Sequence, residues 1–192
     1  NTTARAVMEG AVEIQPSVAT AEERPVSQGA QVSLAGIRVS LESKRLGLMG
    51  RPRGVADRQG RFRIPGTARG ETYNLEVAQL PVGCYVAKMI QGGREIEEAP
   101  LVVTSGPEPV RILIRTDGAT IEGRLRGGPT NPIGTLVVLA PKARASRHRY
   151  RTTRVHQDGR FTIGGVAPGW SFDDHLSNLT AAALSALIPE WQ

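Results

Sequence analysis

An internal repeat restricts the fold of this chain more than any other feature. Residues 60–70 align with residues 159–169 at an offset of 99, and seven of the eleven positions are identical. Two further pairs of segments match upstream in the same order: residues 36–41 with 134–139, and residues 6–12 with 119–125. A period near 100 residues is the size of a domain rather than of a solenoid repeat. The sequence therefore predicts two related modules, the first with a loop insertion over residues 15–31.

Apolar and polar residues alternate along the segments between the turns. Alternation with a period of two is typical of β-strands that bury one face. It is clearest over residues 37–42, 73–77, 110–115 and 121–126. These segments are short and bounded by Gly, Pro, Asp and Asn, and no helical stripe lies between them. We therefore expect Ig-like antiparallel β-sandwiches rather than βαβ units.

The best-matching part of the repeat predicts a tight turn followed by a core strand. Gly60 and Gly159 each complete a turn pair in which glycine supplies a positive φ between two strands. Side chains two residues apart on the following strand point to the same face. Four apolar residues are thus expected in the core: Phe62, Ile64, Phe161 and Ile163.

This arrangement resembles the carboxypeptidase regulatory-like domain family. The resemblance rests on a strand with a Glu-Gly pair, a Gly-Arg-Phe turn, and a Gly-x-x-x-Gly corner that in residues 166–169 reads Val-Ala-Pro-Gly. Residues 80–86 are similar to a strand pair from large tandem proteins of this family in soil bacteria. The resemblance covers most of residues 6–170. It implies a transthyretin-like (prealbumin-like) sandwich of seven strands, related to carbohydrate-binding-like folds, with a non-enzymatic role outside the cytoplasm.

The two modules differ after the corner. Module one, residues 4–116, continues with strands expected over four segments: 72–78, 84–90, 101–104 and 110–114. Module two, residues 117–176, has no counterpart of these strands. An amphipathic helix is expected over residues 177–188 instead, where Leu and Ala recur at helical spacing. Truncation or a frameshift of the second module is the favoured explanation; the alternatives are that the helix or a partner covers the gap.

Composition and motifs argue against a catalytic or metal site. No apolar run reaches 18 residues, and no secretory leader is visible. The single cysteine, Cys84, excludes an internal disulfide framework and a Cys-based zinc site, and we expect it to be a small buried hydrophobe. The His-x-x-Glu pair of zinc carboxypeptidases, the Gly-x-Ser-x-Gly elbow and the phosphate-binding loop do not occur. No catalytic residue, metal ligand or cofactor is therefore expected.

The net charge of +6 conceals two basic segments. Residues 44–69 carry +7 and residues 142–160 carry +6, so the rest of the chain sums to −7. Both segments could be solvated ends of the sandwiches, or they could bind an anion such as an acidic glycan, lipopolysaccharide or nucleic acid. Aromatic side chains among cations suit stacking on a sugar or a base. The candidate ligand-binding residues are Arg147, Arg149, Tyr150, Arg151 and Trp170.

These observations favour a non-catalytic structural or interaction module of a larger extracytoplasmic bacterial protein. Its location would be secreted, periplasmic or associated with the outer membrane. Its partners would be other domains of the parent protein or a protein of the cell envelope. A carbohydrate-binding module is the first alternative. Polyanion or nucleic-acid binding through the basic segments is the second, although no recognised nucleic-acid motif accompanies them.

Overall fold

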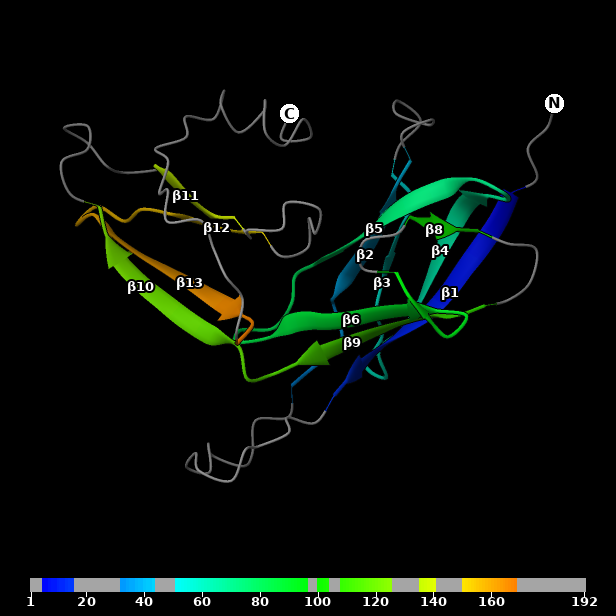
Figure 1. Cartoon of the computed structure of the whole chain (residues 1–192), viewed down its shortest axis with the longest axis horizontal. Coiled ribbons are helices and arrows are strands. Elements are labelled where there is room, and N and C mark those ends of the chain that lie inside the picture. Colours follow the sequence, from blue (N-terminus) through cyan, green and yellow to red (C-terminus); the bar gives the residue numbers. More distant parts are fainter. Residues whose placement is uncertain are drawn as a thin grey trace. The chain divides into compact units, whose positions relative to one another are not determined.

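The computed structural model describes residues 5–15, 32–43, 51–96, 100–103, 108–125, 135–140 and 150–168. Within these residues the protein is all-β, with thirteen strands in several sheets (Figure 1). The chain divides into two compact units, Asn1–Asp117 and Gly118–Gln192. Over the same residues, no helix has the length and apolar character needed to cross a membrane. The helix expected over residues 177–188 lies outside the described part.

Unit 1 contains a sheet of five strands and a sheet of four (Figure 1). The five-stranded sheet has the order β4 (Arg61–Ala68), β1 (Arg5–Ile14), β9 (Val110–Arg115), β6 (Tyr85–Gln91), β7 (Arg94–Glu95). The four-stranded sheet has the order β3 (Arg53–Val55), β2 (Arg38–Glu42), β5 (Thr72–Ala78), β8 (Leu101–Val102). Among the described strands of unit 1, β1 and β9 run parallel and the other pairs are antiparallel.

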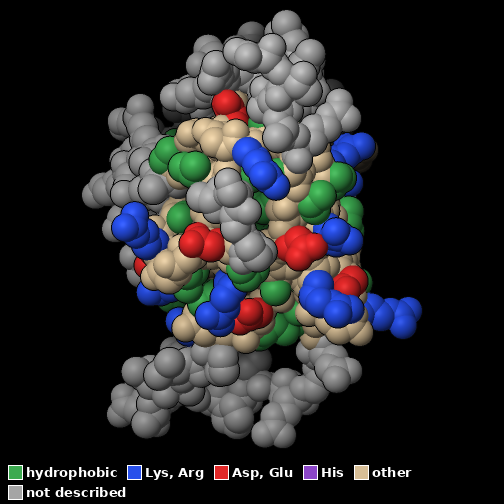
Figure 2. Space-filling model, turned by 90° about the vertical axis from the view of Figure 1, so that its right-hand side faces the viewer, with side chains coloured by type: hydrophobic (Ala, Val, Ile, Leu, Met, Phe, Trp, Pro, Cys, Tyr) green, Lys and Arg blue, Asp and Glu red, His purple; other side chains and the backbone are tan. Residues whose placement is uncertain are grey.

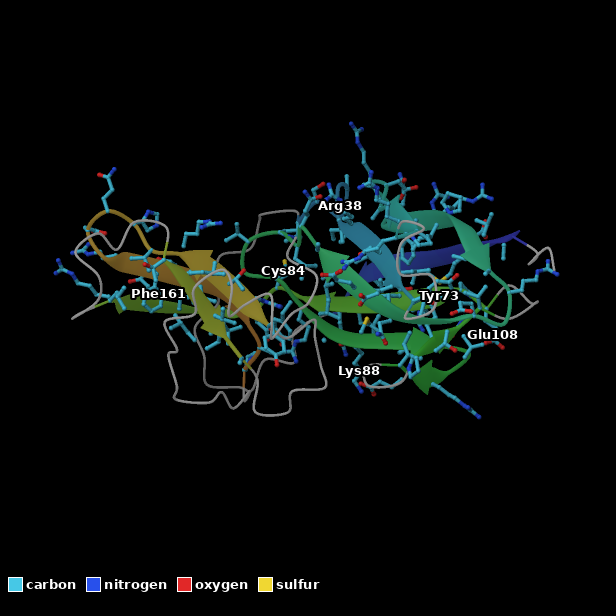
Figure 3. All side chains as sticks on the ribbon, turned by 90° about the horizontal axis from the view of Figure 1, so that it is seen from above. Arg38, Tyr73, Cys84, Lys88, Glu108 and Phe161 are labelled. Atoms are coloured by element: carbon cyan, nitrogen blue, oxygen red, sulfur yellow. The ribbon has the colours of Figure 1, made fainter. Side chains whose placement is uncertain are left out.

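Side chains from both sheets of unit 1 form one buried cluster. Alternate residues of β9 and β2 supply its centre, because Ile112, Val39 and Leu41 are fully buried while their neighbours face outward. Tyr73 on β5 is also fully buried, and its hydroxyl accepts a hydrogen bond of 2.8 Å from the Ala68 N–H (Figure 3). Burial of a phenol is favourable only when its hydroxyl has such a partner. The period-two pattern therefore converts directly into a shared apolar core.

Unit 2 contains two antiparallel strand pairs. One pair joins β10 (Ala119–Arg124) to β13 (Arg160–Val166), and the other joins β11 (Leu136–Leu139) to β12 (Arg151–Arg154). A smaller cluster fills this unit, and its buried members are Val137, Val155, Phe161, Ile163 and Val166. Phe161 on β13 is marked in Figure 3. Ile121, Leu125 and Leu139 pack against the cluster but are only partly buried.

The strands expected from alternation are confirmed. Residues 37–42, 73–77, 110–115 and 121–126 correspond to β2, β5, β9 and β10 with shifts of one or two residues at the ends. Two short strands that the alternation does not predict, β3 and β12, lie inside the basic segments, residues 44–69 and 142–160. Both strands are too short to show a period, and they form because β2 and β11 offer them a free backbone edge.

Candidate functional site

The hairpin turn at the centre of the repeat has the same geometry in both units. Gly60 has a φ of 78° and Gly159 a φ of 80°, a backbone region that L side chains rarely adopt. The Gly60 N–H donates to the Asp57 carbonyl at 3.0 Å, and the Gly159 N–H donates to the His156 carbonyl at 3.0 Å. The expectation of positive φ at these two glycines is therefore confirmed.

A glycine packs against the core phenylalanine in each unit. Gly10 on β1 is the register partner of Phe62 on β4, and Gly123 on β10 is the partner of Phe161 on β13. A Cβ added to Gly10 would lie 2.4 Å from Phe62 Cζ, and one added to Gly123 would lie 2.3 Å from Phe161 Cζ. Real Cβ atoms do not approach so closely, so each ring occupies the place of a side chain on the neighbouring strand.

An aspartate holds each turn through hydrogen bonds and an ion pair. Asp57 Oδ1 accepts the Arg61 N–H at 2.9 Å, and Asp158 Oδ1 accepts the Arg160 N–H at 3.0 Å. The guanidinium Nε atoms lie 3.1 Å and 3.4 Å from the second carboxylate oxygens. Against the opposing effect of desolvation, the bonds from Arg61 lower the pKa of Asp57. The backbone bond from Arg160 likewise lowers the pKa of Asp158.

Two arginines of the first basic segment are paired with acids from elsewhere in unit 1. Arg63 Nε lies 3.0 Å from Glu9 Oε1, its register partner on β1. Arg51 lies between two carboxylates, 3.7 Å from Glu42 and 3.8 Å from Glu76. On the face of the molecule in Figure 2, basic and acidic side chains are interspersed. These pairs reduce the positive field that residues 44–69 would otherwise present to a polyanion.

Two of the five candidate ligand residues fall within the described structure. Arg151 on β12 donates from Nε to the Gly165 carbonyl at 3.3 Å and from Nη1 to the Tyr150 carbonyl at 3.0 Å. Burial lowers the pKa of the Arg151 guanidinium, although an arginine in this position still carries its charge. Tyr150 is partly exposed beside it. Three candidates lie outside the described residues: Arg147, Arg149 and Trp170.

Arg151 therefore acts within the fold of unit 2. The two hydrogen bonds above go to backbone carbonyls, one of the preceding residue Tyr150 and one of Gly165 on β13. These bonds hold the start of β12 against Gly165 on β13, so the guanidinium stabilises the fold of unit 2. Of the candidate residues, the structure describes only Tyr150 and Arg151, which are neighbours.

Cys84 is buried, as expected, directly before β6. Its side chain is 3% exposed, and this burial raises the pKa of the thiol. A raised pKa disfavours the thiolate, which is the nucleophilic form. Across the described residues, no group of three or more His, Cys, Asp or Glu side chains is arranged to hold a metal ion.

One ion pair on the outer face of unit 1 escaped the sequence analysis. Arg111 on β9 holds Glu13 on β1 in a two-pronged contact, with Nε to Oε1 at 3.0 Å and Nη2 to Oε2 at 2.7 Å. The bond from Arg111 lowers the pKa of Glu13 despite the opposing effect of desolvation. The pair spans 98 residues of sequence, and only the parallel pairing of β1 with β9 brings its members together. In the sequence, only the alternation of charged and apolar residues on both strands indicated that such a pair could form.

Comparison with known proteins finds no family model, no curated protein and no solved structure that matches this chain.

Proposed function

We propose that this chain is a non-catalytic structural and interaction module of a larger extracytoplasmic bacterial protein. Its units would be transthyretin-like β-sandwiches of the carboxypeptidase regulatory-like kind, in tandem. The proposed partners are other domains of the parent protein or a protein of the cell envelope. The proposal draws on the resemblance of the sequence motifs and on one structural observation, the kind of residue that the two units share.

The two units share their inward framework residues, and their outer faces agree only in part. At the equivalent inward positions, Gly10 and Phe62 of unit 1 correspond to Gly123 and Phe161 of unit 2 with the same register. On the outer faces Arg61 matches Arg160 and Glu9 matches Glu122, whereas Arg63 is replaced by Thr162 and Ala11 by Arg124. The residues that the units share in the core and the turns are those that a scaffold requires, and this supports a structural role.

The ion pairs of the first basic segment support the same proposal. A polyanion site requires cations whose field is not cancelled by nearby carboxylates. Arg63 and Arg51 have carboxylates within 4 Å, from Glu9, Glu42 and Glu76. Unit 1 thus displays a mixed surface, which is typical of a solvated scaffold rather than of a nucleic-acid groove.

Ligand binding by the full chain tests this proposal. We expect no binding on a glycan array, and no retention of a labelled DNA duplex at physiological salt. A glycan signal that Tyr150→Ala or Trp170→Ala abolishes would replace the proposal with the carbohydrate-binding alternative. DNA affinity that falls by orders of magnitude between about 50 and 200 mM salt would replace it with the polyanion alternative. Arg53→Ala, an exposed change away from both residues, is the matched control.

A further inference from the structure

The first and last described strands of unit 1 lie side by side and run in the same direction. β1 pairs with β9 in parallel, with Gly10 opposite Val110 and Ile14 opposite Ile114. The chain therefore enters β1 at one end of this pair and leaves β9 at the other end (Figure 1). Tension applied along the chain on either side of these strands acts parallel to them and shears the pair.

The direction of tension decides how the hydrogen bonds of a strand pair break. In the β1–β9 pair the bonds run between strands that are pulled in opposite directions, so they are stretched together and must fail together. The other neighbour of β1 is the antiparallel β4, where Val7 lies opposite Pro65 near one end of the pair. Tension applied to both strands at that end opens the β1–β4 pair one bond at a time. Unit 1 thus contains one pair arranged to resist tension and one arranged to peel.

The backbone N–H groups of β1 alternate between its two neighbours. The Val12 N–H donates to the Gly60 carbonyl, at the start of the β4 side, and the Gln15 N–H donates to the Ile114 carbonyl of β9, both at 2.8 Å. Successive N–H groups along a strand point to opposite edges. The N–H groups of Ala11 and Glu13 therefore face β9 as well, and the ladder between β1 and β9 continues to Gln15.

Side chains on both faces of the β1–β9 pair hold its register. On the inner face Val12 lies opposite Ile112, and the two are 1% and 0% exposed. A slip by one residue would turn every inward side chain outward. On the outer face the guanidinium of Arg111 holds both carboxylate oxygens of Glu13, and such two-pronged contacts are specific in geometry. Sliding must therefore break backbone bonds, expose apolar side chains and separate an ion pair at the same time.

The second unit is joined directly to the end of this pair. β9 ends at Arg115 and β10 begins at Ala119, so residues 116–118 alone connect them. An ion pair between Arg115 and Asp117 lies at the start of this connection. Tension that arrives through β10 thus enters β9 without passing through another strand of unit 1.

We propose that unit 1 carries tension along the chain, with the β1–β9 pair as a mechanical clamp that resists shear. The clamp consists of residues 10–15 and 110–114. This function rests on the proposed structural role, because a module transmits force only as part of a larger protein. Resistance to forced unfolding is governed by the unfolding rate rather than by the equilibrium free energy. The geometry of the pair therefore matters more than the total stability of the unit.

The test pulls the full chain with optical tweezers in two directions. Two cysteines introduced at exposed positions hold the DNA handles, and the buried Cys84 is replaced by alanine in both variants. Val7→Cys with Thr116→Cys loads the clamp in shear. Val7→Cys with Arg69→Cys peels β1 from β4, because Arg69 directly follows β4 at the end where Val7 lies.

We expect the two directions to differ at equal pulling speed. The unfolding force should be higher in shear by about twofold or more, because the bonds of the clamp fail together. Extensions of about 350 Å in shear and about 200 Å in peeling identify the events, from the stretched lengths of residues 7–116 and 7–69. The midpoints of urea denaturation should agree between the variants, since equilibrium stability does not depend on the direction of pulling.

Two matched substitutions on β1 locate the resistance. Glu13→Gln weakens an ion pair inside the clamp, whereas Glu9→Gln weakens the ion pair with Arg63 of β4, outside it. Both carboxylates are exposed, so both variants should fold. Under constant tension in the shear direction, Glu13→Gln should raise the unfolding rate by about 1.5–5-fold. Glu9→Gln should leave this rate unchanged.

Two results would overturn the inference. Equal unfolding forces in the two directions would mean that the β1–β9 pair is no clamp. A rate raised as much by Glu9→Gln as by Glu13→Gln would mean that the resistance lies elsewhere in the sheet. Neither result would create glycan or DNA binding, so a failure of the clamp is distinguishable from a failure of the proposed structural function.

Discussion

Gly10→Ala is the substitution that most directly tests the packing common to both units. Alanine normally stabilises a strand interior relative to glycine by about 0.5–1 kcal/mol, because the unfolded chain loses less freedom. At this position the new Cβ would lie 2.4 Å from Phe62 Cζ and 2.5 Å from the Val110 carbonyl oxygen. Phe62 is 2% exposed, and Val110 belongs to the adjacent strand β9. Neither neighbour can move without disturbing the core or the sheet.

The cost of Gly10→Ala follows from these two contacts. Overpacking a well-filled core typically costs about 1–3 kcal/mol for each forced displacement. Two displacements, less the gain in the unfolded state, give a net destabilisation of unit 1 of about 1–5 kcal/mol. Urea denaturation, monitored by hydrogen-exchange mass spectrometry on peptides of β1 and β4, measures this destabilisation. The midpoint of unit 1 should fall by about 1–3 M urea, while unit 2 stays unchanged.

A second-site change isolates the ring contact. Leucine lacks the Cζ and Cε atoms that obstruct the new methyl group, so Gly10→Ala should cost less in a Phe62→Leu background. We expect a coupling energy of about 1–2 kcal/mol, with the contact to Val110 preventing full rescue. The matched pair in unit 2, Gly123→Ala with Phe161→Leu, should be rescued more fully. Its three nearest atoms all belong to the ring. Additive costs, or a Gly10→Ala variant as stable as the parent chain, would refute this account.

Three further outcomes follow from particular residues. Thr67→Val should raise the stability of unit 1 by about 1 kcal/mol in urea denaturation. Thr67 is fully buried, its hydroxyl has no hydrogen-bond partner within the described structure, and unit 2 has Val166 at the equivalent position. A loss of stability would contradict this prediction. Glu13→Gln should cost about 0.2–1 kcal/mol at neutral pH and low salt. Because the folded pKa of Glu13 lies below the ordinary 4.5, this cost should be fully present above pH 4.5 and be lost as the pH falls through the lower pKa of the folded state; a constant cost would show that the charge is irrelevant. Cys84 should react with iodoacetamide far more slowly in the native chain than in urea, and equal rates would disprove its burial.

Strands with strict alternation could be predicted from the sequence because their energetics are local to each strand. In any extended backbone Val110, Ile112 and Ile114 point to one face, and their apolar side chains are stable there only when this face is buried. The core positions Phe62 and Phe161 follow from the same rule. The turn glycines are equally local, since a positive φ is a property of a single residue.

The strands β3 and β12 could not be predicted, because their cause lies in other strands. β3 has three residues with a glycine in the middle, and β12 consists of two arginines around two threonines. Neither shows a period. Each becomes a strand when the neighbouring β2 or β11 presents unpaired backbone groups at the right distance. Burial of backbone without such pairing is costly, so the neighbour imposes the conformation.

The candidate site was harder to predict than the fold for the same reason. Net charges of segments can be counted in sequence, but the partner of a charge depends on strand register. Arg63 meets Glu9 because β4 lies antiparallel to β1 with that register. Arg151, a ligand-binding candidate because of its neighbours in sequence, donates to the carbonyl groups of Tyr150 and Gly165. Sequence proximity and spatial proximity coincide within turns and diverge across sheets.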